Sequence, residues 1–156
     1  MLRAVTNVVI AGLGGQGVIT ASDVLARAAL AAGFDVKKSE THGMSQRGGS
    51  VHSDVRFGER VLSPMVAPGE ADYLVVLDPA EVEPERYLLR PGGELFAPDQ
   101  VDAHLLPSKR SLNVALLALL SRRLPIPPDA FHAALGECFK PELARVLVPL
   151  FDAVRG

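Results

Sequence analysis

Cysteine and tryptophan are the residues that this sequence uses least. Cys138 is the single cysteine among 156 residues, and tryptophan is absent, so a disulfide within the chain is excluded. One thiolate also cannot hold an iron–sulfur cluster or a structural zinc ion, because those sites take about four ligands. The histidines do not compensate, since none of them forms the i, i+4 pair of a helical metal site: His42, His52, His104 and His132. We therefore expect no metal ligands in this chain.

A strong net charge and a long apolar run are also missing. The chain has 16 basic and 18 acidic residues, a formal net charge of −2, which gives no electrostatic footprint for nucleic acid or for an anionic membrane. The longest apolar stretch, residues 112–120, falls short of the ~20 residues that cross a bilayer. Only Arg3 precedes the first expected strand, so there is no signal-peptide pattern. We expect one globular domain, residues 1–156, in the cytoplasm.

What the sequence does contain is a buried strand that runs into a glycine-rich turn, NVVIAGLGGQG at 7–17. Residues 8–10 are an unbroken β-branched run, which is typical of a parallel strand buried on both faces. Residues 12–17 have the pattern G-x-G-x-x-G. Apolar residues then recur at helical spacing over 18–32, and Gly33 follows as a C-terminal stop. The unit is predicted to be strand, glycine turn and helix.

The glycine turn is the first candidate site, with Gly12, Gly14, Gly15, Gln16 and Gly17 as its binding residues. Glycine permits positive φ and lets backbone N–H groups approach a ligand closely. Unpaired N–H groups and the positive end of the helix dipole would both point at the mouth of the turn, where a phosphate, pyrophosphate or carboxylate could bind. A tight packing turn with nothing bound is the alternative.

The polar loop 41–50, THGMSQRGGS, is the second candidate site. Its binding residues would be Ser45, Gln46, Arg47, Gly48 and Gly49, which place one cation among small donors and a flexible glycine backbone. Such a loop can fold around an anionic or carbonyl-bearing ligand. A solvated connection is the alternative.

The remaining pattern predicts an α/β fold: a Rossmann-like, open and mostly parallel sheet flanked by helices, with a short hairpin and a helical C-terminal third. Strands are expected at 34–39, on an edge, and at 51–57, 71–77 and 94–97, with 60–63 returning beside 51–57 as the hairpin. Helices are expected at 108–124, 129–139 and 141–154, and 98–107 is expected to be a loop. The apolar stripe of 112–120 is broad enough to require cover on most sides.

Several acidic residues have a structural and a functional interpretation. Asp78 is expected to cap the helix that begins at Pro79, although it also lies at the carboxyl end of a strand, where open α/β sheets bind ligands. Glu81, Glu83 and Glu85 are interpreted as a solvated helix face rather than as paired catalytic acids. Glu40 matches the ribose-binding acid of dinucleotide folds poorly, because it lies too far from the glycines and no second helix follows.

Three stretches make the sequence resemble a known family. They are NVVIAGLGGQGVITASDVLARAA, SETHGMSQRGGSVHSDVRFGERVLSPMV, and GEADYLVVLDPAE with RPGGELF, and a weaker match runs from SLNVALLALL to FKPELARVLVPLFDAVRG. Together they resemble the gamma-type subunit of the 2-oxoacid:ferredoxin oxidoreductases and, within that family, the beta subunit of indolepyruvate oxidoreductase. GMSQRGGSV, at this distance after the glycine turn, is the most specific part.

The resemblance implies a reaction shared between subunits. The family catalyses coenzyme A-dependent oxidative decarboxylation of a 2-oxoacid and passes the electrons to ferredoxin, with thiamine diphosphate and iron–sulfur clusters on partner subunits. This chain would be a subunit without catalytic residues that completes the active site or the coenzyme A path, for indolepyruvate, pyruvate or another 2-oxoacid. It carries no GDG…NN motif for thiamine diphosphate. The glycine turn would contact coenzyme A, thiamine diphosphate or only protein.

Two further expectations follow from the segments 98–110 and 63–68. Other family members commonly have a strand–helix–strand stretch where this chain has only residues 98–110. The outer strands of the sheet, and any site that they would line, are therefore not expected to follow the family's pattern in this chain. The apolar helix 112–120 and the segment SPMVAP at 63–68 suggest a subunit interface, and hence a homo-oligomer.

The alternative function is a self-sufficient enzyme, a nicotinamide dehydrogenase or an S-adenosylmethionine methyltransferase, that uses loop 12–17. A methyltransferase would usually have an acidic residue just ahead of the glycines, where this chain has Ile10 and Ala11.

Overall fold

The central strand β1 (Thr6–Leu13) organises a five-stranded sheet. The computed structural model describes residues 5–42 and 49–156, and the strand order is β2-β3-β1-β4-β5. Strand β1 pairs antiparallel with β3 (Ser50–Gly58) and parallel with β4 (Ala71–Val76). The edges are β2 (Asp35–His42), antiparallel to β3, and β5 (Leu89–Phe96), parallel to β4. The expected α/β class is confirmed, with an open sheet that is mixed rather than mostly parallel.

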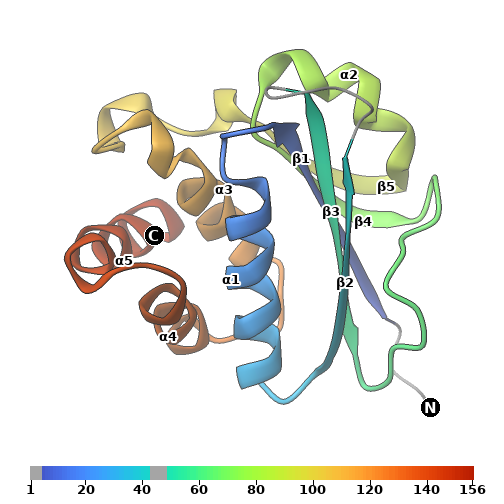
Figure 1. Ribbon diagram of the computed structural model, residues 1–156, viewed down its shortest axis with the longest axis horizontal. Coiled ribbons are helices and arrows are strands. Elements are labelled where there is room, and N and C mark those ends of the chain that lie inside the picture. The colour runs from blue at the N-terminus through green and yellow to red at the C-terminus, as the bar shows by residue number, and fades with distance from the viewer. Residues whose placement is uncertain (1–4, 43–48) are drawn as a thin grey trace.

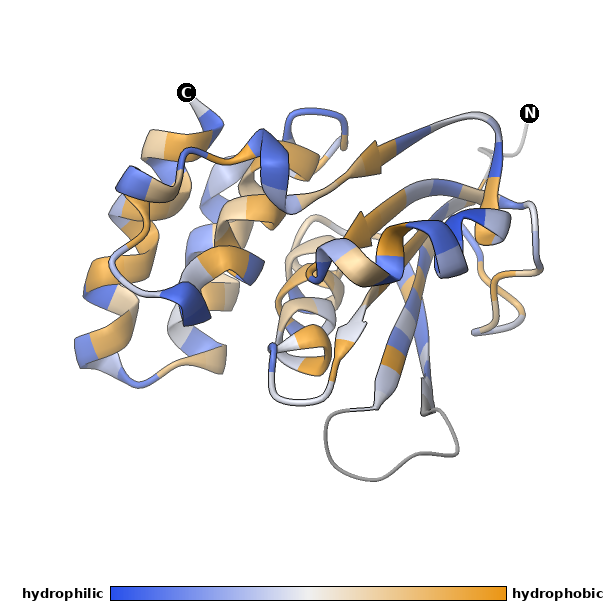
Figure 2. Ribbon diagram, turned by 90° about the horizontal axis from the view of Figure 1, so that it is seen from above, coloured by the Kyte–Doolittle hydropathy of each residue, from blue (hydrophilic) through white to orange (hydrophobic). Residues whose placement is uncertain are grey.

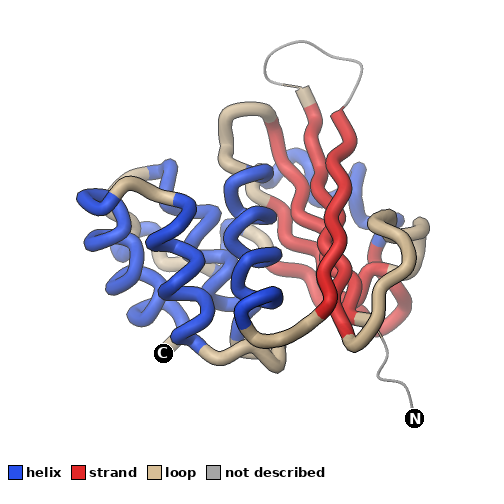
Figure 3. The backbone as a smooth tube through the Cα atoms, turned by 60° about the horizontal axis from the view of Figure 1, so that its bottom comes forward, coloured by secondary structure: helices blue, strands red, loops and turns tan. Residues whose placement is uncertain are grey.

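Helices cover the two faces of the sheet unequally (Figure 1). One face carries α1 (Val18–Ala31), α3 (Leu112–Ser121), α4 (Pro128–Cys138) and α5 (Pro141–Arg155). The other face carries only the short α2 (Val82–Glu85) with the 3-10 turns η1 (Pro79–Glu81) and η2 (Arg86–Leu88). Three more turns, η3 (Pro98–Gln100), η4 (Ala103–Leu105) and η5 (Lys109–Ser111), connect β5 to α3. Figure 3 shows the sheet between these two groups of helices.

Alternation along the strands divides the core into two clusters. Val8 and Ile10 of β1 belong to the larger cluster, under the four helices, whereas Val9 belongs to a smaller cluster with Val66 and Leu88. All three β1 side chains are fully buried, as expected for a strand with period-2 alternation between two covered faces. The outer helices carry hydrophobic and hydrophilic residues side by side, because each buries only one of its faces (Figure 2).

The return strand predicted at 60–63 does not form. Residues 59–70 cross the sheet without strand structure, and both sides of β3 are taken by other strands, β2 and β1, each antiparallel to it. The backbone N–H of Val61 donates instead to the carboxylate of Asp35, at 2.8 Å. Val61 and Val66 are buried while Met65 between them is 62% exposed. The segment is therefore held by side-chain burial and by a carboxylate rather than by a strand ladder.

The helical C-terminal third forms close to its predicted positions. The helix expected at 108–124 is shorter, because α3 begins at Leu112 after the turn η5. Its apolar side chains are covered by the chain itself, with Leu116, Leu117 and Leu120 at 0% exposure. The breadth of this stripe is thus explained by internal packing and gives no argument for a subunit interface. No helix in the described ranges 5–42 and 49–156 is both long and apolar enough to span a membrane.

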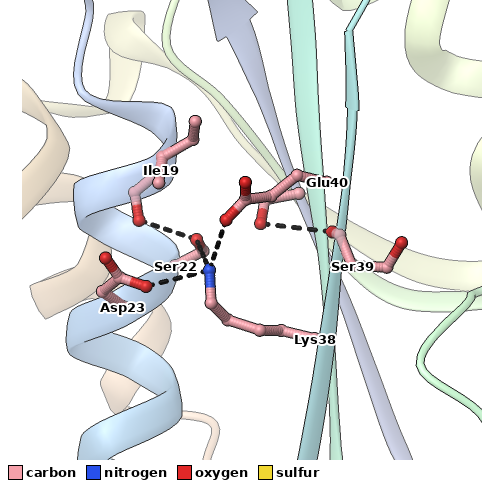
Figure 4. A network of polar contacts seen from close by, with 7 residues as sticks. Ile19, Ser22, Asp23, Lys38, Ser39 and Glu40 are labelled. Atoms are coloured by element: carbon pink, nitrogen blue, oxygen red, sulfur yellow. Dashed lines mark hydrogen bonds and ion pairs between the residues drawn. The ribbon is translucent and has the colours of Figure 1, made fainter.

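Lys38 ties the edge strand β2 to α1 (Figure 4). Its Nζ lies 2.9 Å from an oxygen of Asp23 and 2.6 Å from one of Glu40, and it donates to the hydroxyl of Ser22 at 3.4 Å. Burial alone would lower the pKa of Lys38, but the bonds to the two carboxylates outweigh it and raise the pKa. Glu40 is therefore engaged within the fold, which agrees with its poor match to a ribose-binding acid.

The internal position of α3 gives a stability prediction. Leu116→Ala should lower the free energy of unfolding by about 2–5 kcal/mol, because it removes a fully buried side chain and leaves a cavity. Leu30→Ala on α1 is the matched control: Leu30 is 64% exposed, and its loss should change stability by less than about 0.5 kcal/mol. Urea unfolding of both variants measures the difference. Equal effects of the two substitutions would contradict the internal packing of α3.

Candidate functional site

The glycine turn lies where the chain connections diverge to opposite faces of the sheet. After β1 the chain turns into α1 on the larger helical layer, whereas after β4 it turns into η1 and α2 on the other face. Strands β1 and β4 are parallel neighbours, so their carboxyl ends open side by side between the diverging connections. Such a switch point is where open α/β sheets bind ligands.

Gly12 and Gly17 are required by the close packing of the turn. A Cβ on Gly12 would lie 2.8 Å from Oε1 of Gln16, and one on Gly17 would lie 2.5 Å from Nδ2 of Asn113. Gly17 also has φ of 87°, and Gly15 has φ of 90°, in the left-handed region that side chains disfavour. In the structure, glycine is required for steric reasons at Gly12, for conformational reasons at Gly15, and for both at Gly17.

Gln16 fixes the turn from inside. Its Oε1 accepts the backbone N–H of Leu13 at 2.7 Å, and its Nε2 donates to Oδ2 of Asp78 at 2.8 Å. The other oxygen of Asp78 accepts the N–H of Ala80 at 2.9 Å, which confirms the predicted cap. Asp78 thus performs two tasks, capping η1 and holding the glycine turn of the neighbouring strand.

Asn113 is a site residue that the sequence reasoning missed. It lies in the first turn of α3, is 4% exposed, and donates from Nδ2 to the carbonyl of Gly17 at 3.2 Å. Its Oδ1 accepts the N–H of Val114 at 2.8 Å. A polar residue inside the apolar run LNVALLALL was the available signal, because a buried amide needs specific partners.

The second predicted loop is described only in part. Ser45, Gln46, Arg47 and Gly48 lie outside the described residues. Gly49 is described, and its carbonyl accepts the backbone N–H of Gly14 at 2.9 Å. The end of the second loop is therefore joined directly to the glycine turn, so the two candidate sites predicted from the sequence adjoin.

A cavity of about 310 Å³ opens beside the glycine turn. Its lining comes from three places: the turn, the end of β4, and the connection between β5 and α3. The lining residues are Gly15, Gln16, Leu77, Leu106, Lys109, Arg110 and Leu112. Leu106 lies in the segment 98–107 that was expected to be a loop, and the other lining residues on this side lie in the first residues of the predicted helix 108–124. Neither Lys109 nor Arg110 was predicted as a site residue, because no motif marks them.

Polar side chains also gather on the opposite face of the sheet, under α2. Ser50 donates to Glu81, and Nδ1 of His52 lies 3.2 Å from Oδ1 of Asp54. The bond to Asp54 raises the pKa of His52, and burial raises the pKa of Glu85. Glu81 is only 8% exposed, and Oε2 of Glu85 is buried without a partner among the described residues.

The interpretation of the helix 79–85 as a solvated acidic face is therefore wrong for two of its three glutamates. Only Glu83 is largely exposed, and it pairs with Arg86 one turn later. Glu81 and Glu85 point toward β3 instead, because this face of the sheet has little other cover. This burial could not be predicted from the sequence, because it depends on where β3 lies in the sheet.

The groups at the main site suit the binding of an anion. The first turns of α1 and α3 contain no acidic residue, and α1 has no side-chain cap, so its free N–H groups and dipole favour an anion. No cluster of metal-ligating side chains occurs in the ranges 5–42 and 49–156. The site combines an apolar cavity with donors and cations.

Comparison with known proteins gives the family. The family described as pyruvate ferredoxin/flavodoxin oxidoreductase matches residues 7–111, which include the glycine turn and most of the cavity lining. Over 141 residues the chain is 37% identical to the indolepyruvate oxidoreductase subunit IorB of Archaeoglobus fulgidus, covering 90% of this chain and 57% of that protein. The chain spans about half the length of the curated relatives it matches.

Solved structures share the fold. The gamma subunit of a keto/oxoacid ferredoxin oxidoreductase from Geobacter sulfurreducens superposes with a TM-score of 0.79 at 18% identity, over 98% of this chain and 95% of that one. The 2-oxoglutarate:ferredoxin oxidoreductase from Magnetococcus marinus, solved with 2-oxoglutarate, coenzyme A and succinyl-CoA, gives 0.78 at 22% identity, over 98% of this chain and 31% of that one. With the match over 7–111, the chain belongs to the pyruvate ferredoxin/flavodoxin oxidoreductase family.

Proposed function

We propose that this chain is the small, gamma-type subunit of a cytoplasmic 2-oxoacid:ferredoxin oxidoreductase, inactive alone. Its partners would be the subunits that bind thiamine diphosphate and iron–sulfur clusters, and ferredoxin would be reached through them. The observation that carries the proposal is the family match over 7–111, which includes the glycine turn at the switch point of the sheet. The single cysteine supports the assignment of the iron–sulfur clusters to the partner subunits, because a cluster needs about four ligands.

In this role the chain completes the coenzyme A path of the complex. The glycine turn and its cavity favour an anionic group, and coenzyme A carries phosphates. The likeness to IorB favours indolepyruvate as the 2-oxoacid, and pyruvate or another 2-oxoacid is the second choice.

A self-sufficient dinucleotide or S-adenosylmethionine enzyme is not favoured. Such a fold needs an acid at the end of its second strand to bind the ribose. Here β2 is an antiparallel edge strand, and Glu40 is bound by Lys38.

Reconstitution tests the proposal. With the thiamine- and cluster-binding subunit of the same organism, addition of this chain should restore coenzyme A-dependent reduction of ferredoxin by a 2-oxoacid, followed by visible absorbance. The chain alone should be colourless and should not decarboxylate indolepyruvate or pyruvate, because it lacks cluster and thiamine ligands. Turnover by the chain alone, or full activity of the partner without it, would contradict the proposal.

Arg47 provides a second test, since the sequence makes it the one cation of its glycine-flanked loop. We expect Arg47→Ala to lower the activity of the reconstituted complex roughly ten- to a hundredfold, as expected for loss of charge-assisted hydrogen bonds to an anion. The melting temperature of the isolated chain should fall by a few degrees at most, on the order expected for a small stability change. Arg47→Lys should recover only part of the loss, because a point charge cannot replace a planar fork.

The matched control for Arg47 is Arg86→Ala, which removes an exposed arginine from the turn η2. It should leave activity unchanged. Full activity of Arg47→Ala would make its loop a solvated connection, whereas a large fall in melting temperature would make Arg47 structural.

A further inference from the structure

Four titratable side chains meet between β3 and the cover of the sheet's second face, opposite α1 (Figure 1). His52 and Asp54 come from β3, Glu81 from η1 and Glu85 from α2. Asp54 lies opposite Val9 in the strand register, and Val9 belongs to the smaller core cluster on that face. Asp54 and Glu81 are buried, and Oε2 of Glu85 is buried without a partner in the ranges 5–42 and 49–156. We call these four residues the His52 cluster.

The charge of the His52 cluster depends on its single imidazole. The charges of His52, Glu81 and Asp54 all act on the carboxyl of Glu85, so the four groups lie close to one another. Nδ1 of His52 is 3.2 Å from Oδ1 of Asp54. No lysine or arginine in the described part of the chain forms an ion pair with any of the three carboxylates. Among those residues, protonated His52 is therefore the one cation that balances three acids.

The elements around the cluster add no further charge to it. The sheet neighbours of His52 and Asp54 are uncharged: Ala11, Thr41, Val9 and Ser39. Arg56, two residues beyond Asp54, donates its hydrogen bonds to oxygens outside the cluster. On the cover, Glu83 and Arg86 pair with each other. The other titratable residues of the neighbouring segments are exposed: Lys37, Glu59, Arg60, Glu70 and Tyr87.

The His52 cluster joins two parts of the cover to β3. Oδ2 of Asp54 accepts the backbone N–H of Val66 at 2.9 Å, which holds the segment 59–70. Ser50, at the start of β3, donates to Glu81, which holds η1 and the helix α2 that follows it. Val66 also packs in the smaller core cluster with Leu88 of η2. A change of charge in the His52 cluster therefore acts on both parts of the cover.

Proton binding favours the folded arrangement of these groups. The hydrogen bond to Asp54 raises the pKa of His52 against the opposing effect of burial, and the charges of Asp54 and Glu85 raise it further. The contribution of His52 to stability is therefore complete below its ordinary pKa of about 6.5 and is lost as the pH rises through the raised value. Burial raises the pKa of Glu85, which acts in the same direction at lower pH. Deprotonation of His52 leaves three carboxylates without a cation.

We propose that the His52 cluster is a pH-dependent switch, in which protonated His52 holds the segment 59–70 and the cover η1–α2 on β3 and its deprotonation releases both. The three carboxylates that remain repel one another at a half-buried position, and water that enters between β3 and the cover lowers this repulsion. The cap of η1, Asp78, also holds Gln16 of the glycine turn, so the switch acts on an element that supports the site. This property of the fold goes beyond the proposed function.

Hydrogen exchange of the full chain without partner subunits, followed amide by amide by NMR from about pH 5.5 to about pH 8.5, tests the switch. The amides of Val66 and Glu81 donate to Asp54 and to the carbonyl of Asp78. After correction for the intrinsic pH dependence of exchange, their protection should fall about three- to thirtyfold across this range, between the effects of an exposed ion pair and of a charged hydrogen bond.

Leu25 of α1 is the internal control, because it is fully buried on the other face of the sheet. Its protection should change less than about twofold over the same range, as expected for a site far from the switch. Constant protection at Val66 or at Glu81 would overturn the proposal. An equal fall at Leu25 would do the same, because it would show a general loss of stability.

The variant His52→Gln removes the titrating group and keeps a donor for Asp54. At about pH 5.5 it should show the low protection of Val66 that the parent shows at about pH 8.5, with no further fall as the pH rises. The matched control is His104→Gln, because Nδ1 of His104 lies 3.1 Å from Oδ1 of Asp102 in a pair of the same spacing that is exposed. This control should keep the pH profile of the parent, whereas a parent-like profile in His52→Gln would contradict the switch.

The variant Glu85→Gln should act in the opposite direction, because it removes one of the three repelling carboxylates. At about pH 8.5 the protection of Val66 should exceed that of the parent by about threefold or more, as expected for the loss of a like-charge contact. Glu83→Gln is the control, since it removes the same charge from an exposed residue of α2 and should leave the profile unchanged. Lower protection at every pH in both His52→Gln and Glu85→Gln would make the cluster purely structural and overturn the proposal.

Discussion

The structure depends on one steric constraint, the absence of side chains where β1 passes into α1. Gln16 and Asn113 fill the space that a Cβ on Gly12 or Gly17 would need. Their amide groups satisfy backbone atoms of the same turn, the N–H of Leu13 and the carbonyl of Gly17. The glycines therefore serve a purpose beyond flexibility. They let two amide side chains reach the backbone of the turn and fix its shape.

The mixed sheet places this turn between two unlike environments. On one face, α1 and α3 pack against the strands and α4 and α5 cover those two helices, so that Val8 and Ile10 are fully buried. On the other face, α2, its flanking turns and the segment 59–70 cover the sheet, and polar side chains such as Glu81 and His52 lie on that face. The site opens at the boundary between the two faces, where the backbone connections part and leave room for a ligand.

Local pattern predicted the fold well where a segment's own residues decide its structure. Helix α1 and strand β4 follow from unbroken apolar periodicity, and Asp78 from its capping position. Contacts between residues far apart in the sequence decide the features that were not predicted. The strand expected at 60–63 was lost because Asp35, 26 residues away, accepts the N–H of Val61. Asn113 is a site residue only through a carbonyl 96 residues away. No periodicity in residues 98–110 could have assigned Leu106, Lys109 and Arg110 to a cavity wall.

The two hydrogen bonds that fix the turn have a consequence for how the chain folds. Gln16 and Asp78 are 62 residues apart, and Asn113 and Gly17 are 96 apart. Contacts of such long range close large loops, and their closure costs conformational entropy. The turn and the cavity wall therefore take their shape only when β4 and α3 are both packed against the first strand, turn and helix. A molecule that binds in the cavity contacts segments that are far apart in the sequence, and it stabilises the native state by mass action.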